Sequence, residues 1–128
     1  MTSFEPELWV DSPRAAIAFY ARAFGATVLH QVGDGDDLVA QLAVGEARFW
    51  VSNCDGRVRL SPRATGGATG RVLVCVEDPD AVAARAVAAG ATELAPVSDE
   101  HGWRLGRITD PAGHEWEVGR PLGEWPPA

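Results

Sequence analysis

Residues 16–32 read AIAFYARAFGATVLHQV, and residues 81–97 read AVAARAVAAGATELAPV. The two stretches are identical at nine aligned positions, and their shared Gly-Ala-Thr-x-Leu run does not depend on alanine. Ser-Pro precedes the first copy and Asp-Pro the second, as expected of an N-cap followed by proline in the first helical turn. A glycine stands in each copy where a left-handed C-cap residue is wanted. The repeat therefore predicts a capped helix that leads into a strand, twice.

The flanking sequence completes two copies of one module. Alternating apolar residues and Gly-rich turns predict the remaining strands of each copy. The predicted elements of the first copy are strand 6–11, helix 13–24 and strands 26–32, 38–44 and 47–53; those of the second are strand 71–77, helix 79–89 and strands 92–97, 103–109 and 114–119. We therefore expect an α+β fold of two tandem βαβββ modules.

The predicted modules divide the chain into a few segments. We expect one domain over residues 1–128, with modules at 4–53 and 71–120 and a proline-rich tail at 121–128. The intervening segment, 54–70, is rich in Gly, Ser, Thr and Pro and is expected to run over the surface as a linker. A loop of this length could cover a site.

Composition excludes several classes of function. The net charge is −7, and all basic residues are arginines, which argues against a general nucleic-acid binder and against Schiff-base chemistry on a lysine. No signal-peptide pattern and no apolar run of membrane-spanning length occurs. We expect a cytoplasmic protein that binds neither nucleic acid nor membrane. Cys54 and Cys75 have no close spacing and are expected to be reduced thiols.

Two motifs resemble a known family. The stretch VDSPRAAIAFYARAFGA at 10–26 and the stretch GRITDPAGHEWEV at 106–118 resemble the vicinal oxygen chelate superfamily, and most closely its small glyoxalase/bleomycin-resistance group. The resemblance implies a cupped mixed sheet with helices outside, whose concave face holds a ligand or a metal. It does not settle the reaction, because this scaffold hosts unrelated chemistries.

The resemblance also transfers four metal positions, which fall at Glu5, Trp50, Arg71 and Glu117. An indole and a guanidinium cannot bind a cation, and two carboxylates alone are a poor ligand set for zinc or iron. We therefore expect no cofactor and a lost metal site, in which Arg71 bridges Glu5 and Glu117 in a partly dry cup. The alternative is a weakly held divalent ion (zinc, nickel, iron or manganese) on the two glutamates, with help from an exposed histidine such as His101.

Strand alternation predicts what faces the cup instead, because residues two apart share a face. The predicted concave-face residues are Glu5, Glu7, Trp9, Arg48, Trp50, Ser52, Arg71, Leu73, Cys75, Glu115 and Glu117. Trp116 should point the other way and pack under a helix. The resemblance places Trp103 and Arg104 near the mouth of the cavity, where they could stack on a planar ligand and grip an anionic group. The tryptophans could instead be core or dimer contacts, and the charges could pair with one another.

Three functions are compatible with these features. The first is a binding protein for a small aromatic or polycyclic molecule. The second is a glyoxalase-type lyase or isomerase, in which Glu5 and Glu117 are the catalytic residues. The third is a regulatory or dimerisation module without a ligand. A homodimer is expected in each case, because so short a chain must cover its exposed sheet edges, and Trp125 in the tail is expected at that contact.

Overall fold

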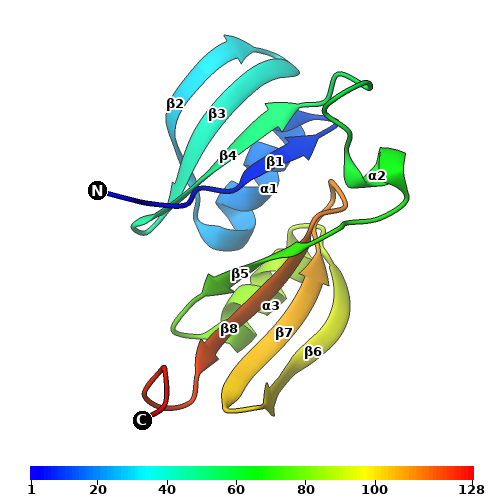
Figure 1. Cartoon of the computed structure of the whole chain (residues 1–128). Helices are drawn as coiled ribbons and strands as arrows, with labels where there is room; N and C mark the ends of the chain where they lie inside the picture. The colour runs from blue at the N-terminus through cyan, green and yellow to red at the C-terminus, as the bar shows by residue number, and fades with distance from the viewer.

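The computed structural model of the protein describes residues 1–128 and contains two four-stranded sheets and three helices (Figure 1). The prediction of an α+β fold built from two βαβββ modules is confirmed. The elements in chain order are β1 (Glu7–Val10), α1 (Pro13–Phe24), β2 (Thr27–Asp34), β3 (Asp37–Val44), β4 (Ala47–Asn53), α2 (Pro62–Thr65), β5 (Arg71–Cys75), α3 (Pro79–Ala88), β6 (Thr92–Glu100), β7 (Trp103–Thr109) and β8 (Glu115–Pro121).

Local signals set the ends of the long helices. The Ser12 hydroxyl accepts a hydrogen bond from the Ala15 amide at the start of α1, and the Asp78 carboxylate accepts one from the Ala81 amide at the start of α3. Gly25 closes α1 in the left-handed region with φ of 72°. Helix α3 lacks the left-handed glycine C-cap that the repeat predicts for both helices. It ends at Ala88, and its C-cap residue has right-handed helical geometry.

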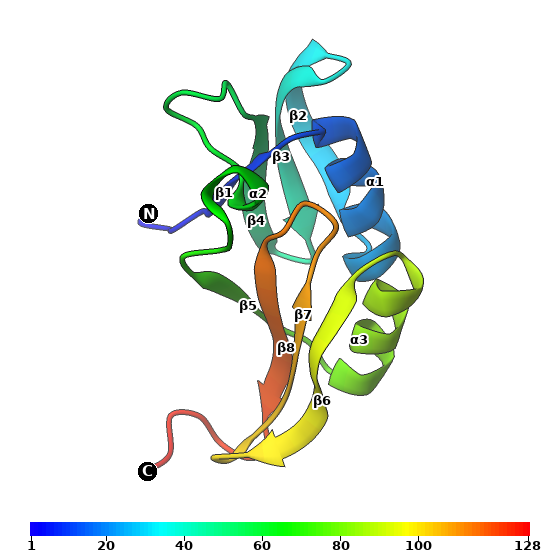
Figure 2. The same cartoon turned by 90° about the vertical axis from the view of Figure 1, so that its right-hand side faces the viewer.

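Each sheet is mixed and carries its module's first strand at an edge. The strand orders are β1-β4-β3-β2 and β5-β8-β7-β6; β1 runs parallel to β4 and β5 runs parallel to β8, while the other pairs are antiparallel. Figure 2 shows α1 and α3 together on one side of the molecule, with both sheets beside them and α2 on the far side. The Arg85 guanidinium ties the two helices together by donating to the Arg22 carbonyl at 3.1 Å.

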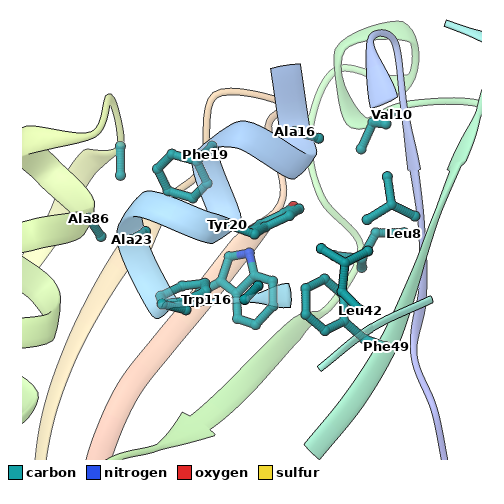
Figure 3. Close-up of a cluster of buried hydrophobic side chains, with 14 of the residues drawn as sticks. Leu8, Val10, Ala16, Phe19, Tyr20, Ala23, Leu42, Phe49, Ala86 and Trp116 are labelled. Atoms are coloured by element: carbon teal, nitrogen blue, oxygen red, sulfur yellow. The ribbon is translucent and has the colours of Figure 1, made fainter. Parts of the chain in front are cut away.

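The core lies on the helix side of the sheets and is shared by the modules. Trp116 of β8 is 3% exposed and packs against Tyr20, Phe24 and Phe49 of the first module, with ring centroids 4.9 to 5.7 Å apart (Figure 3). The expectation that Trp116 packs under a helix is therefore confirmed. Because this shared core occupies the helix-side faces, the opposite sheet faces are left for function.

The segment between the modules is more ordered than a plain linker. It contains the short helix α2, which is not among the predicted elements and which the Ser61 hydroxyl caps by accepting from the Ala64 amide. Asp55 organises the segment's start by accepting hydrogen bonds from three successive backbone amides, at positions 57 to 59. These bonds hold the pKa of the Asp55 carboxyl below its ordinary value. These contacts give the segment a defined local structure.

Several strand ends differ from the expected ones. Strand β5 stops at Cys75, whereas β6 continues to Glu100 and β8 to Pro121. The Ser-Asp-Glu stretch at 98–100 resembles a loop in composition, but it pairs with β7 as the end of a hairpin.

None of the three helices combines the length and the apolarity that crossing a bilayer would require. Both cysteines are free thiols, and burial, followed by the charge of Asp11, raises the pKa of Cys54.

Candidate functional site

The polar side chains predicted for the cup lie on the sheet faces opposite the core. In β1, Leu8 and Val10 are buried, while Glu7 and Trp9 alternate with them. In β8, Trp116 and Val118 are buried, while the glutamates at 115 and 117 alternate with them. Strand alternation therefore assigned these faces correctly.

On the first module's face, two glutamates hold two tryptophans. The Trp9 indole N–H donates to Glu7 at 2.9 Å, and the Trp50 indole N–H donates to Glu5 at 3.0 Å. Gln41 also donates to Glu5, at 2.7 Å. Neither carboxylate has an arginine within salt-bridge distance, so both glutamates are paired with neutral donors only.

On the second module's face, arginines and glutamates alternate across the strands. Arg71 lies 3.1 Å from Glu115 and 3.5 Å from Glu117, and Arg107 lies 3.1 Å from Glu117 and 2.6 Å from Glu100. The Arg107 guanidinium holds the pKa of the Glu100 carboxyl below its ordinary value. The charged side chains on this face are therefore mostly paired with one another.

The prediction that Arg71 bridges Glu5 and Glu117 in a partly dry cup differs from the structure in two respects, namely one partner and the exposure of the side chain. Arg71 pairs with Glu117 and Glu115, whereas Glu5 is held by Trp50 in the other sheet. The reason is register, because parallel pairing places Arg71 directly opposite Glu115 on the neighbouring strand. The Arg71 side chain is also 43% exposed, so the cup around it is not dry.

The residues at the four family metal positions do not fit a divalent ion. Trp50 directs an N–H donor at Glu5, and Arg71 brings a positive charge to Glu117, which a second arginine also contacts. No three His, Cys, Asp or Glu side chains gather in a group that could hold a metal. Glu5 and Glu117, the alternative ligand pair, belong to separate hydrogen-bonded clusters on separate sheets.

A cavity of about 440 Å³ lies where the two modules meet beside the 54–70 segment. Its polar lining combines four residues predicted for the ligand site, namely Glu7 and Trp9 from the first module and Arg71 and Glu115 from the second. The segment contributes apolar side chains such as Leu60 and the glycine-rich backbone of residues 67–70. Polar and aromatic residues predicted from both modules therefore line one partly open cavity.

The cavity wall is anchored to the second module. The Arg63 side chain donates to the Pro111 carbonyl in the β7–β8 turn. At Gly113 in the same turn, an added Cβ would lie 3.1 Å from the Pro62 side chain, so the turn and α2 are closely packed. The turn itself is closed by the bond from the Gly113 amide to the Asp110 carbonyl, as the Asp-Pro-Ala-Gly sequence predicts.

His114 is a cavity residue that strand alternation does not single out. Its ring Nε2 lies 2.7 Å from the Trp9 carbonyl oxygen and so joins the turn before β8 to β1. The alternation predicts that His114 points away from Glu115 and Glu117. It nevertheless borders the cavity, because it precedes the strand and lies at the module junction. Its position after the Asp-Pro-x-Gly turn is the one signal in the sequence.

The other predicted ligand residues lie elsewhere. Glu5, Arg48 and Leu73 line a second, more apolar cavity of about 770 Å³ beneath the N-terminal arm. Trp50 and Trp103 border neither of these two cavities. Trp103 instead packs edge to face on Trp125 of the tail, with ring centroids 5.2 Å apart.

Arg104 does not lie at the mouth of the cup as expected. Its guanidinium makes two hydrogen bonds to Asp80 in the first turn of α3, at 2.6 and 2.7 Å, and one to Asp99 at 2.8 Å. It shares a strand face with Ile108, which is 1% exposed, and this is the helix side of the sheet. Arg104 therefore positions α3, and each of its three guanidinium nitrogens already donates to a carboxylate.

Known proteins share this sequence and architecture. The family described as "Glyoxalase-like domain" matches residues 7–119. An uncharacterized protein of Mycobacterium bovis is 34% identical over 95% of this chain and 85% of its own length. TioX from Micromonospora sp. ML1 has a TM-score of 0.74 at 28% identity, covering 95% of this chain and 100% of that one. The bleomycin-binding protein in complex with bleomycin has a TM-score of 0.70, covering 94% and 98%, and its 17% identity shows the fold alone. The chain belongs to the glyoxalase-like family of the vicinal oxygen chelate superfamily.

Proposed function

We propose that this protein binds a small aromatic or polycyclic molecule in the cavity between β1, residues 54–70 and β5. The observation that supports the proposal is the convergence of Glu7, Trp9, Arg71 and Glu115, from both modules, on one partly open cavity. Its volume of about 440 Å³ lies in the range of small-molecule sites, which typically measure about 300 to 1,000 Å³.

The lining suits a planar molecule. Trp9 offers an indole face whose ring N–H donates to Glu7, while the Trp9 backbone carbonyl accepts a hydrogen bond from the His114 ring. Leu60 and Val72 supply apolar surface. A rigid aromatic wall with a few polar groups is the usual composition of a ligand pocket. The known complex of a bleomycin-binding protein offers an analogy on the same fold.

The enzymatic alternative has less support. It requires Glu5 or Glu117 to act as a general base beside a divalent metal. Glu117 is paired with two arginines, and Glu5 accepts two hydrogen bonds in the other sheet. Both carboxylates are therefore already engaged by donors within the protein.

Tryptophan fluorescence tests the binding proposal. A panel of two-ring and three-ring aromatic compounds should quench the emission saturably, with one ligand per chain. Trp125→Phe, which changes an exposed tail residue, should leave the saturable component in place, whereas Trp9→Phe should remove it. Equal quenching in the wild type and both variants, without saturation, would reject the cavity as the binding site.

We also propose that the chain forms a homodimer. The support is the exposure of apolar side chains on the edge strand of each sheet, namely Val28, Leu29 and Val32 on β2 and Leu94 on β6. Trp125, which was expected at the dimer contact, is a weaker candidate for it because its ring packs on Trp103 of its own chain. Light scattering should give twice the 13.6 kDa chain mass at micromolar concentration. A monomer there would contradict the proposal.

A further inference from the structure

We infer that the ligand of this cavity carries a protonated amine and that His114 is one of the groups that receive it. This inference rests on the proposed function and specifies the ligand's charge. It follows from the hydrogen-bonding capacity that remains on the polar side chains of the cavity after their contacts within the protein are made.

His114 leaves one ring nitrogen for a ligand. A backbone carbonyl can only accept a hydrogen bond, so the 2.7 Å contact with Trp9 requires a proton on Nε2 of His114. In the neutral ring, Nδ1 is then an acceptor, and it has no hydrogen-bond partner within the protein. No buried side-chain nitrogen or oxygen lacks a partner, so this nitrogen reaches accessible space. Because His114 borders the cavity, a ligand N–H can meet it there.

The two glutamates add further acceptors. In Glu7, one oxygen receives the Trp9 indole and the Ser52 hydroxyl, at 2.9 and 3.4 Å, while the other oxygen has no partner. In Glu115, one oxygen faces Arg71 and the other is unpaired. The cavity thus offers three acceptors that the protein does not satisfy, on Glu7, Glu115 and His114.

The net charge of the cavity lining also favours a ligand with a protonated amine. Two carboxylates and one guanidinium face the cavity, which gives −2 + 1 = −1 with His114 neutral. The Nε and Nη1 atoms of Arg71 face Glu115 and Glu117, so its charge is shared between two carboxylates and only Nη2 remains for a ligand. The Trp9 indole face adds a cation–π contribution for an ammonium group beside it. An aromatic molecule that carries an alkylamine group is therefore the matching ligand class.

A matched ligand series tests the inference. Isothermal titration calorimetry at neutral pH would compare 2-naphthylmethylamine, 2-naphthylmethanol and 2-naphthoate, which share one ring system. The amine should bind at least about tenfold more tightly than the alcohol, since a hydrogen bond to a charged group contributes roughly 1.5–3 kcal/mol, and the acid should bind most weakly. If the alcohol or the acid binds as tightly as the amine, the inference fails and the proposed function stands. If none of the three binds, both fail.

Three variants assign the effect to residues. His114→Gln keeps an N–H that can reach the Trp9 carbonyl, but its acceptor, the amide oxygen, no longer lies at the position of Nδ1. It should therefore weaken amine binding about tenfold and leave alcohol binding unchanged. Glu7→Gln should weaken amine binding similarly, whereas Glu124→Gln, the same charge change on the exposed tail, should not. Unchanged melting temperatures would show that the fold is intact. Equal losses in the two glutamate variants would overturn the inference, because net charge alone would then explain the preference.

Discussion

Replacing Asp110 by alanine should cost more stability than any other single polar substitution described above. The carboxylate is 3% exposed and accepts hydrogen bonds from the Tyr20 hydroxyl at 2.5 Å and the Trp116 indole at 2.9 Å. Its other oxygen accepts from the Ala112 and His114 amides at 2.9 and 3.0 Å. Asp110 thus joins α1 of the first module to the turn and last strand of the second.

The magnitude follows from the donors that would lose their acceptor. A buried donor left without a partner costs roughly 1–3 kcal/mol, so the Tyr20 and Trp116 donors together cost roughly 2–6 kcal/mol. We expect a loss of about 4 kcal/mol from a total that is typically about 5–15 kcal/mol. Urea unfolding followed by tryptophan fluorescence measures it. Tyr20→Phe removes one donor and leaves the other three bonds, so it should cost only about 1–2 kcal/mol.

Two results would refute this reasoning. Asp110→Ala within about 1 kcal/mol of the wild type would show that the buried donors find other partners or water. A Tyr20→Phe variant as unstable as Asp110→Ala would show that the phenol alone, and not the four-bond hub, joins the modules.

Three further predictions use other parts of the structure. Burial, and then the charge of Asp110, raise the pKa of Tyr20 well above its ordinary value of 10.0. Tyr20 therefore ionises at lower pH in the unfolded chain than in the folded one, so stability is retained below pH 10 and falls as the pH rises beyond it. Phenolate absorbance of this single tyrosine should appear only on unfolding. Ionisation in the folded state near pH 10 would contradict the prediction. Gly119→Ala should lower the free energy of unfolding by roughly 1–3 kcal/mol, because the added Cβ would lie 2.7 Å from the Arg104 carbonyl oxygen. Gly70→Ala adds a Cβ in open space and should not lower it. Equal urea midpoints for the two variants would contradict the prediction. Arg71→Met should change stability by less than about 1 kcal/mol, because its pairs are partly exposed, and a loss of several kcal/mol in the same urea assay would show a dry, buried bridge.

Local patterns explain what could be predicted from the sequence. Helix Pro13–Phe24 and strands Ala47–Asn53 and Trp103–Thr109 have the predicted bounds, because caps, turn glycines and alternation act over a few residues. Helix α2 follows the same Ser-Pro signal that begins α1. Its four residues lack the apolar periodicity that identifies longer helices, so the signal is readable only in retrospect.

The composition of the site depends on long-range placement and was harder to predict. Alternation predicts that Glu7, Trp9, Arg71 and Glu115 share concave faces, but not that these four meet while Glu5 lies in another cluster. That outcome depends on the packing of one module against the other. The partner of His114 is a backbone carbonyl 105 residues away, and no periodicity or motif encodes such a contact.

The most direct test of the central claim is a titration of the indole N–H signals in a two-dimensional ¹H–¹⁵N NMR spectrum. The chain has five tryptophans, and single Trp→Phe variants assign their signals. On addition of 2-naphthylmethylamine, the Trp9 signal should shift saturably, while the signals of Trp103 and Trp125, which pack on each other away from the cavity, should stay in place. A spectrum in which the Trp9 signal does not move, or in which only the Trp103 and Trp125 signals move, would contradict a ligand site at the junction of the two modules.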